Sequence, residues 1–242
     1  MDKKIEPSCA SCVNEVKDRI CLSETGKGSK GCPTLISKEI LKKANLKYED
    51  KDIFKLARQA SIQEADCYSN RHEIPYIMQP SKTRIVEICE FAQKMEYSRI
   101  GVAFCIGLYG EVKTVESIFQ AYGFEVVSVC CKAGRTSKDL LGIEDKDKIF
   151  RGTDESMCNP IFQAEALNEA KVDLNVLLGL CVGHDVLFFQ HSKIPTTVLA
   201  VKDRVTGHNH LAAIYNADSY YQKIKKQGKE KNSRIMIFEA CE

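Results

Sequence analysis

Four cysteines near the N-terminus are the residues whose type and spacing most clearly indicate chemistry. Cys9, Cys12, Cys21 and Cys32 form the pattern C-x2-C-x8-C-x10-C, and Pro33 follows the last of them. The segment that carries them has almost no apolar run with which to build a core. Thiolates bind zinc and iron–sulfur clusters, and metal binding can supply the folding free energy that such a segment lacks. We therefore predict that these four cysteines hold a metal centre.

The spacing of the four cysteines bears on which metal they bind. Structural zinc sites commonly pair their ligands in two close-spaced knuckles, whereas this segment has one close pair, Cys9 and Cys12, and then two single cysteines. A final Cys-Pro, here Cys32-Pro33, is a recurring element of bacterial ferredoxins, although the spacing differs. The pattern favours an iron–sulfur cluster of the 4Fe–4S type, with zinc as the alternative.

A second set of cysteines lies beside predicted elements in the rest of the chain. Apolar runs typical of buried strands end at or just before Cys105, Cys131 and Cys181. The fourth member of the set, Cys158, precedes a predicted helix. In an open parallel sheet the carboxyl ends of the strands meet at one edge. Because side chains alternate along a strand, we expect Cys131 rather than Cys130 to face that edge. This set is either a second metal or thiol site or a group of buried cysteines that act as small apolar side chains.

Polar side chains accompany these strand-end cysteines. His184 follows Cys181 in a predicted strand-to-helix turn, and a polar stretch after the next strand contains Asp203, Arg204 and His208. A histidine can bind a metal or move a proton near neutral pH, and an arginine can bind an anion through two hydrogen bonds. The plainer role for His184 is to cap its own helix, and the plainer role for Asp203 and Arg204 is a structural ion pair with each other. These residues are candidates for a pocket that takes a small anionic or sulfur-containing substrate, or that serves a redox partner.

The elements that would position these residues are first helices and then an alternation of strands and helices. Helices are predicted from Ser37, from Asp52 and from Ser81, with these three residues as N-caps. Strands are predicted over 99–105, 124–130, 173–180, 195–201 and 234–240, and helices over 111–122, 159–171, 183–192 and 211–226. Continuous apolar strands separated by helices predict an open, mostly parallel, Rossmann-like α/β sheet with helices on both faces. We expect residues 1–36 to form the cysteine-rich metal-binding segment, and 37–242 to form the helices and the α/β domain.

Composition narrows the classes of protein that fit. The 242 residues carry 35 basic and 33 acidic side chains, so the formal charge of +2 gives no field that favours nucleic acid or an anionic membrane. The N-terminal sequence does not resemble a signal peptide, and no segment has the length of a membrane-spanning helix. A cytoplasmic location is therefore expected, where thiols remain reduced and available to metals.

Nucleotide binding is a further alternative. The segment IGLYGE joins a strand to a helix with Gly107 and Gly110 near the turn, where backbone amides can bind phosphate. Neither the dinucleotide-binding glycine pattern nor the P-loop pattern is present, so the two glycines more simply allow a tight turn.

Several motifs resemble those of a known family. The N-terminal cysteines with Cys32-Pro33, followed by MCNPIFQAEALN, GLCVGHDVLF and VKDRVTGHNHLAAIY, are similar to a bacterial and archaeal family of unknown function described as predicted metal-binding proteins. The resemblance covers nearly the whole chain. It implies metal binding through the cysteines but no particular reaction, substrate or catalytic residue.

These observations favour one function and leave two alternatives. The favoured hypothesis is a cytoplasmic metalloprotein that combines an iron–sulfur cluster with redox or thiol chemistry at the strand-end pocket. One alternative is a non-catalytic binding or regulatory module stabilised by zinc. The other is the nucleotide-binding enzyme.

Overall fold

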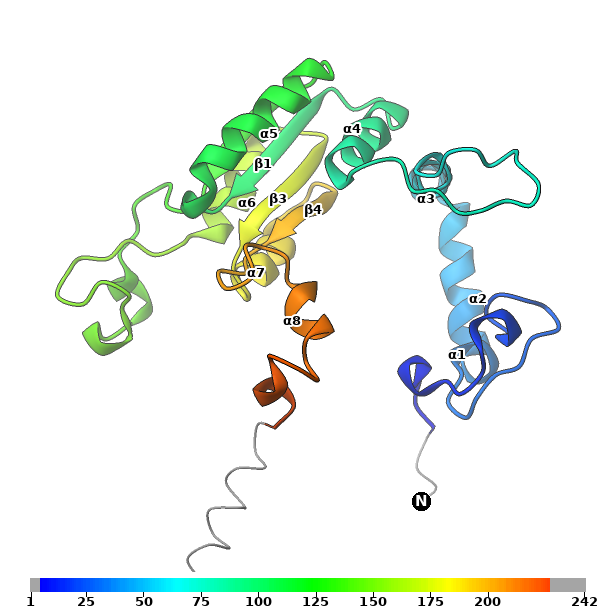
Figure 1. The fold of residues 1–242 in the computed structure, drawn as a ribbon. Helices are drawn as coiled ribbons and strands as arrows, with labels where there is room; N and C mark the ends of the chain where they lie inside the picture. The colour runs from blue at the N-terminus through cyan, green and yellow to red at the C-terminus, as the bar shows by residue number, and fades with distance from the viewer. Residues whose placement is uncertain (1–4, 227–242) are drawn as a thin grey trace, which may run out of the picture. The chain divides into compact units, whose positions relative to one another are not determined.

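The computed structural model of the protein describes residues 5–226 (Figure 1). The chain divides into two compact units, with the boundary between Ser81 and Lys82. The strand expected over 234–240 lies outside the described residues. No helix in the described range is long and apolar enough to cross a membrane.

The first unit consists of a cysteine-rich segment followed by helices. The short helices η1 and η2 precede α1, α2, η3 and α3: Cys9–Ser11, Val16–Asp18, Pro33–Ile36, Lys38–Leu46, Lys47–Glu49 and Lys51–Asp66. Helix α1 ends at Ile36, and the helices that follow it up to α3 belong to the same compact unit. The prediction of Asp52 as an N-cap is wrong by two residues, because the Asp50 carboxylate accepts hydrogen bonds from the amides of Asp52 and Ile53 and so caps α3.

The second unit is an α/β domain whose elements follow the predicted alternation. The strands β1 to β4 are Arg99–Phe104, Glu125–Cys130, Leu174–Leu180 and Thr196–Val201. The helices α4 to α7 are Arg84–Lys94, Tyr109–Ala121, Pro160–Glu169 and His184–His191. Helix α4 begins after Thr83 and not at Ser81, because the Ser81 hydroxyl and amide both donate to the carbonyl of Cys67.

All four strands run parallel in the order β2-β1-β3-β4. This confirms the predicted open, parallel α/β sheet. The chain leaves β1 toward one edge to form β2, and then crosses to the other side to form β3 and β4, so the strand order reverses between β1 and β3. In open α/β sheets, ligand sites lie at the carboxyl ends of the strands near such a reversal.

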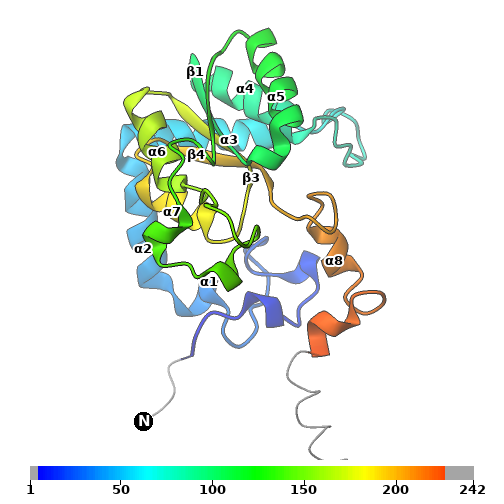
Figure 2. The ribbon, with the colours of Figure 1, turned by 90° about the vertical axis from the view of Figure 1, so that its left-hand side faces the viewer.

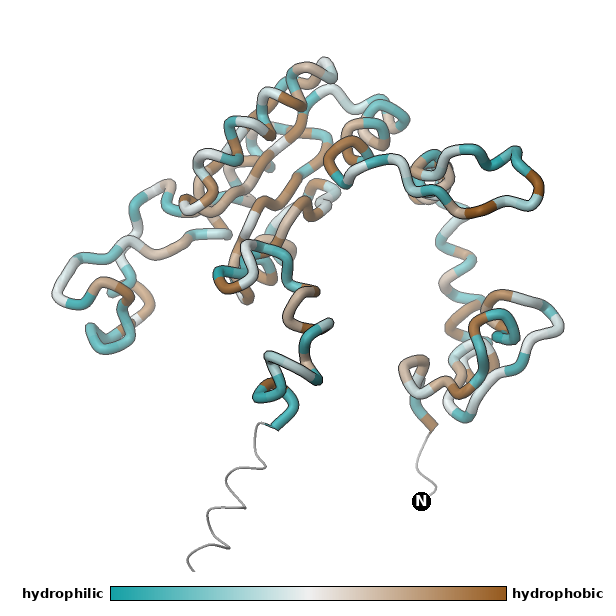
Figure 3. The backbone as a smooth tube through the Cα atoms, viewed as in Figure 1, coloured by the Kyte–Doolittle hydropathy of each residue, from teal (hydrophilic) through white to brown (hydrophobic). Residues whose placement is uncertain are grey.

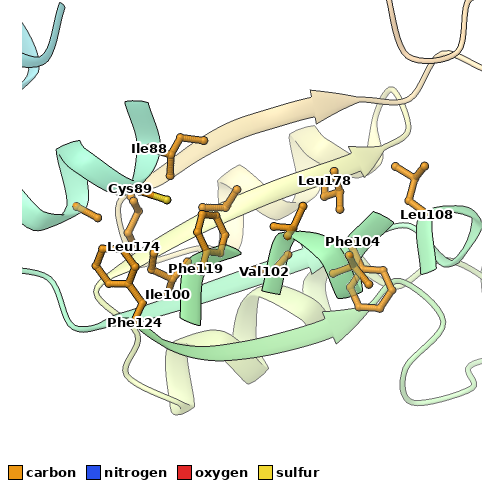
Figure 4. Packing of buried hydrophobic residues seen from close by; sticks show 14 residues of the cluster. Ile88, Cys89, Ile100, Val102, Phe104, Leu108, Phe119, Phe124, Leu174 and Leu178 are labelled. Atoms are coloured by element: carbon orange, nitrogen blue, oxygen red, sulfur yellow. The ribbon is translucent and has the colours of Figure 1, made fainter. Parts of the chain in front are cut away.

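Helices cover both faces of the sheet (Figures 1 and 2). On one face, α4 and α5 pack against the strands, and the fully buried Phe119 of α5 lies among residues such as Ile100 and Leu174 (Figure 4). On the other face, α6 and α7 contribute Leu167 and Phe188, which are also fully buried. Burial of each such side chain contributes about 1.5–3 kcal/mol, so the two cores hold the strands firmly in register. Figure 3 shows the corresponding concentration of apolar residues along the strands.

The end of the described chain differs from the predicted helix over 211–226. Helix α8 spans only Leu211–Tyr215, and the short helix η7 follows at Gln222–Lys226. Asn216 ends α8, and its side-chain amide donates to the carbonyl of Ala212. Asn and Ser side chains compete for backbone groups in this way and interrupt helices, which is why the single helix was wrong.

Candidate functional site

The residue that follows each strand carries a thiol or an amine. Cys105 follows β1, Cys131 follows β2, Cys181 follows β3 and Lys202 follows β4. The register places the ends together, because Phe104 pairs with both Cys130 and Leu178. Chemically active side chains from four strands therefore lie along one edge of the sheet.

Ladder hydrogen bonds fix these positions beyond the formal ends of the strands. The amide of Cys105 donates to the carbonyl of Leu178 at 3.0 Å, and the amide of Cys131 donates to the carbonyl of Phe104 at 2.8 Å. The amide of Lys202 donates to the carbonyl of Leu180 at 3.0 Å. The backbone of each residue is thus held as rigidly as the sheet itself.

Cys158 reaches the same edge through a long connection. The chain leaves β2 at Cys131, forms an excursion over 132–157 and returns, and the amide of Asn159 then donates to the carbonyl of Cys131 at 2.8 Å. An ion pair between Lys138 and the buried Glu155, 2.8 Å apart, helps to close the base of the excursion. This closure places Cys158 beside Cys131, with their sulfur atoms 3.6 Å apart.

Three thiols form a hydrogen-bonded row with Cys131 in the middle. Contacts with Cys105 and Cys158 raise the pKa of the buried Cys131 far above the usual value for a thiol, so Cys131 keeps its proton. The hydrogen bond with Cys131 lowers the pKa of Cys105 to about 5 and that of Cys158 to about 4. The backbone amide of Ile106 also donates to the Cys131 sulfur, at 3.4 Å. Cys105 and Cys158 are therefore the thiols of the row that ionise most readily, and Cys131 is the one that holds its proton.

His184 completes this row at the Cys158 end. It is the first residue of α7, and its hydrogen bond with Cys158 is the second cause of the low pKa of that thiol. The same contact raises the pKa of His184. Each partner thus stabilises the charged form of the other, and a thiolate–imidazolium pair of this kind activates a cysteine as a nucleophile.

Cations line the rest of the edge. The ammonium of Lys202 lies beside Cys105, and its charge and hydrogen bond contribute to the low pKa of that thiol. The charge of the Lys132 ammonium also lowers the pKa of Cys158. Arg204 donates from Nη2 to the sulfur of Cys181 at 3.1 Å. Each of the site thiols other than Cys131 therefore has a cation nearby, which is Lys202 for Cys105, Lys132 for Cys158 and Arg204 for Cys181.

Two of the predicted pocket residues instead organise the loop after β4. The carboxylate of Asp203 accepts hydrogen bonds from the amides of Val205 and Thr206, and the contact with Thr206 lowers its pKa. His208 accepts from the amide of Asp203 through Nδ1 at 3.0 Å and returns a backbone hydrogen bond to its carbonyl at 2.8 Å. These contacts stabilise the turn that presents Arg204.

Lys132 and Lys202 are site residues that were not among the predicted ones. Lys202 directly follows strand β4 and Lys132 directly follows Cys131, so their positions in the sequence could have indicated a place at the site. Sequence patterns make such lysines hard to distinguish from solvated ones, because a lysine at the end of a strand is commonly just exposed.

The N-terminal cysteines lie in the first unit, in a segment tied together by local hydrogen bonds. The amide of Ser8, next to Cys9, donates to the carbonyl of Gly31, next to Cys32, at 3.0 Å. The hydroxyl of Ser29 donates to the sulfur of Cys12 at 3.4 Å and lowers the pKa of that thiol. The amide of Ile20, next to Cys21, donates to the carbonyl of Lys27 at 3.1 Å. The ends of the segment are thereby drawn together.

The donor set of this segment fits a thiolate-ligated metal centre, although the sulfur atoms do not surround a common point. Cys12 already accepts hydrogen bonds of the kind that support metal-bound sulfur, from Ser29 and from Asn14. Gly28 lies against Cys32, because a Cβ atom built at position 28 would be 3.2 Å from the Cys32 sulfur. Within residues 5–226, no three His, Cys, Asp or Glu side chains are arranged so that they could hold one metal ion.

The protein is thus an α/β protein with a parallel sheet and a row of thiols beside the strand ends. The chain belongs to the family described as "Protein of unknown function (DUF1847)", whose model matches residues 32–199. This confirms the resemblance to a family of unknown function. The matched residues include Cys32 and all four strand-end cysteines, but not Cys9, Cys12 or Cys21.

A relative from the archaeon Methanocaldococcus jannaschii supports the same assignment. It is an uncharacterised protein that is 45% identical over 192 residues, which cover 79% of this chain and 91% of the relative. The similarity therefore extends over nearly the whole relative.

Proposed function

We propose that this protein performs thiol–disulfide exchange at the strand-end site, with Cys158 as the nucleophile. The observation that carries the proposal is the pair of sulfur atoms of Cys158 and Cys131, 3.6 Å apart. One of the two is a thiolate paired with His184, and the other is a thiol. A thiolate beside a second, protonated thiol is what disulfide exchange requires.

The first step is attack on a substrate disulfide. The Cys158 thiolate forms a bond to one sulfur of R–S–S–R, the substrate S–S bond breaks, and one R–S⁻ leaves. Loss of the Cys158 charge removes one of the causes that raise the pKa of Cys131. The mixed disulfide therefore makes the second thiol easier to ionise.

The second step releases the substrate. Cys131 passes its proton to the adjacent Cys105 thiolate and attacks the Cys158 sulfur, which breaks the mixed disulfide and frees the second R–S⁻. Cys131 and Cys158 end as a disulfide, oxidised by two electrons, and the substrate disulfide is reduced by the same two electrons. Lys202, beside Cys105, stabilises the thiolate until it accepts the proton.

Single-turnover exchange with bis(2-hydroxyethyl) disulfide tests this proposal. Peptide mass mapping after quenching should find the Cys131–Cys158 link in the wild-type chain. Cys158→Ser should slow release of thiol from the site by at least about a thousandfold, since loss of a nucleophile has effects of this size. Cys131→Ser should instead trap the mixed disulfide on Cys158.

Cys130→Ser is the matched control, because Cys130 is the neighbour of Cys131 but packs against the apolar core. It should form the link at the wild-type rate. A Cys131–Cys158 link that forms no faster in the native chain than in the denatured chain would remove the basis of the proposal.

The same proposal includes a metal centre in the first unit, with Cys9, Cys12, Cys21 and Cys32 as its ligands. An iron–sulfur cluster would supply one-electron chemistry, whereas zinc would supply only stability. The exposure of Val13 and Leu22, at 88% and 67%, supports a role for metal in folding because these side chains form no core. Iron, labile sulfide and zinc analysis of anaerobically purified protein distinguishes the two, and colourless protein with one zinc per chain would exclude the cluster.

A further inference from the structure

We propose that Arg204 makes the strand-end site selective for disulfides that carry an anionic group, a carboxylate or a sulfonate, near the reacting sulfur. This inference rests on the proposed thiol–disulfide exchange and names its substrate class. Arg204 is the specificity-determining residue in this proposal, and it does not take part in bond making.

The placement of Arg204 supports this role. The side chain is exposed, and its hydrogen bond to Cys181 uses one donor of a guanidinium that has five. In the described part of the chain, no second hydrogen bond or ion pair of Arg204 occurs. The remaining donors form a planar fork of the kind that binds carboxylates and sulfonates through two hydrogen bonds.

Arg204 also lies within electrostatic reach of the reacting thiols. Its contact with Cys181 is the main cause that raises its pKa, and the charges of Cys105 and Cys158 add to the effect. The geometry agrees with this: the amide of His184 donates to the carbonyl of Cys181 at 3.0 Å, so the thiol that Arg204 contacts lies in the same turn as the imidazole partner of Cys158. In this proposal the substrate disulfide places its charged end on Arg204 and one of its sulfur atoms against Cys158.

The neighbouring acidic groups do not neutralise Arg204 by pairing with it. Asp203, the adjacent residue in sequence, directs its carboxylate at the amides of Val205 and Thr206. Asp185 directs its carboxylate at the amides of Gly183 and Val186. The alternative predicted from sequence, an ion pair between Asp203 and Arg204, is therefore absent from the described contacts.

Two alkylating reagents test this inference without any need for turnover. Iodoacetate is anionic and iodoacetamide is neutral, and both alkylate a thiolate. The ratio of their rates at Cys158, measured by mass spectrometry of the peptide, should be about fivefold higher in the native chain than in urea-denatured chain, as expected for one charge contact at the surface. Arg204→Gln should bring the native ratio to within about twofold of the denatured one.

Arg151→Gln is the matched control, because Arg151 is exposed and donates only to the carbonyl of Lys146 among the described contacts. It should leave the ratio unchanged. An equal ratio in the wild-type chain and in Arg204→Gln would overturn the inference.

A series of disulfides then separates the inference from the proposed function. The native chain should react with 3,3′-dithiodipropionate faster than with bis(2-hydroxyethyl) disulfide, and slowest with cystamine, which is cationic. Equal rates with all three would overturn the anion selectivity but keep the exchange reaction. No Cys131–Cys158 link with any of them, together with a raised iodoacetate ratio, would overturn the exchange reaction and keep Arg204 as an anion-binding residue.

Discussion

The two cysteine-bearing regions differ in what holds their thiols in place. In the first unit, Cys9 and Cys21 are exposed on a segment tied by a few local hydrogen bonds, and its apolar side chains lie in solvent. At the strand ends, Cys105 and Cys131 are buried, and the backbone of each extends the hydrogen-bond ladder of the sheet. The cysteines of the first unit are thus held by a weakly bonded segment, whereas those at the strand ends are held by the sheet.

The way in which the thiols are held limits the chemistry that each region can support. A weakly held set of thiols gains order from a ligand that joins them, so metal binding and folding are coupled. A rigid set has its geometry before any ligand binds, so neighbouring groups can set the protonation of each thiol. The comparison therefore predicts that the first region depends on metal, while the second depends on the sheet and its charges.

The largest expected effect is the loss of metal from the first region. Cys9→Ser or Cys32→Ser should abolish metal retention after dialysis and unfold the segment, because structural metal binding is worth on the order of 10 kcal/mol. Cys67→Ser is the control, since the buried Cys67 donates to the carbonyl of Gln63 and lies outside the four-cysteine set. Metal content per chain and circular dichroism measure the outcome. Equal metal content in all three variants would refute the assignment.

The next effect concerns the pH dependence of the strand-end thiols. The pKa of Cys158 is lowered to about 4, so its thiolate persists as pH falls and is lost only near that value. At pH 5 an ordinary thiol with a pKa of about 8.5 is almost fully protonated. A thiolate of low pKa is also a weaker nucleophile. At pH 5 we therefore expect Cys158 to be alkylated about thirtyfold faster in the native chain than in the denatured chain.

Iodoacetamide labelling of the Cys158 peptide between pH 4 and pH 8 measures this effect. His184→Gln removes the imidazolium and should raise the pKa of Cys158, so labelling of that variant should fall at a higher pH. If native Cys158 loses reactivity near pH 8 as the denatured chain does, the thiolate–imidazolium pair is not formed.

The smallest effect tests how far the sheet positions the site. Gly179 in β3 has a φ of +71°, and a Cβ there would overlap the Leu108 side chain. Gly179→Ala should lower the free energy of unfolding by about 1.5 kcal/mol, since it strains the backbone where β3 approaches Cys181. Urea denaturation measures the change.

Gly110→Ala is the matched glycine control for this test. Gly110 lies in α5 with no atom within 4 Å of its Cβ position, so alanine should raise stability by about 0.5 kcal/mol. Equal destabilisation by both substitutions would show that the bend at Gly179 has no special part in the site.

Much of the fold was predictable because apolar periodicity reports burial directly. Strand β3 is buried at all seven positions, and its sequence is an apolar run in which Asn175 is the one polar residue. The helix over 211–226 was not predictable in the same way, because a hydrogen bond from Asn216 interrupts it. The N-cap of α3 was displaced for a similar reason, since Asp50 and Asp52 have the same side chain and only local geometry separates them.

The candidate site was predictable in part. The sequence placed Cys105, Cys158 and Cys181 near one edge, and favoured Cys131 over Cys130, because strand ends and side-chain alternation follow from the pattern. It did not separate Arg204, which contacts a site thiol, from Asp203 and His208, which bond within their own loop. Side chains in one polar stretch can point in any direction until the turn is formed.

The amino-acid pattern was enough to predict a parallel α/β sheet with thiols at its strand ends, in addition to the four N-terminal thiols. Which thiols meet, and which of them holds its proton, depends on the folded chain. Cys131 and Cys158 are 27 residues apart, and their contact depends on the closure of the excursion between them. Protonation is set by groups a few ångströms away in space, and the sequence order of those groups does not reveal their distance.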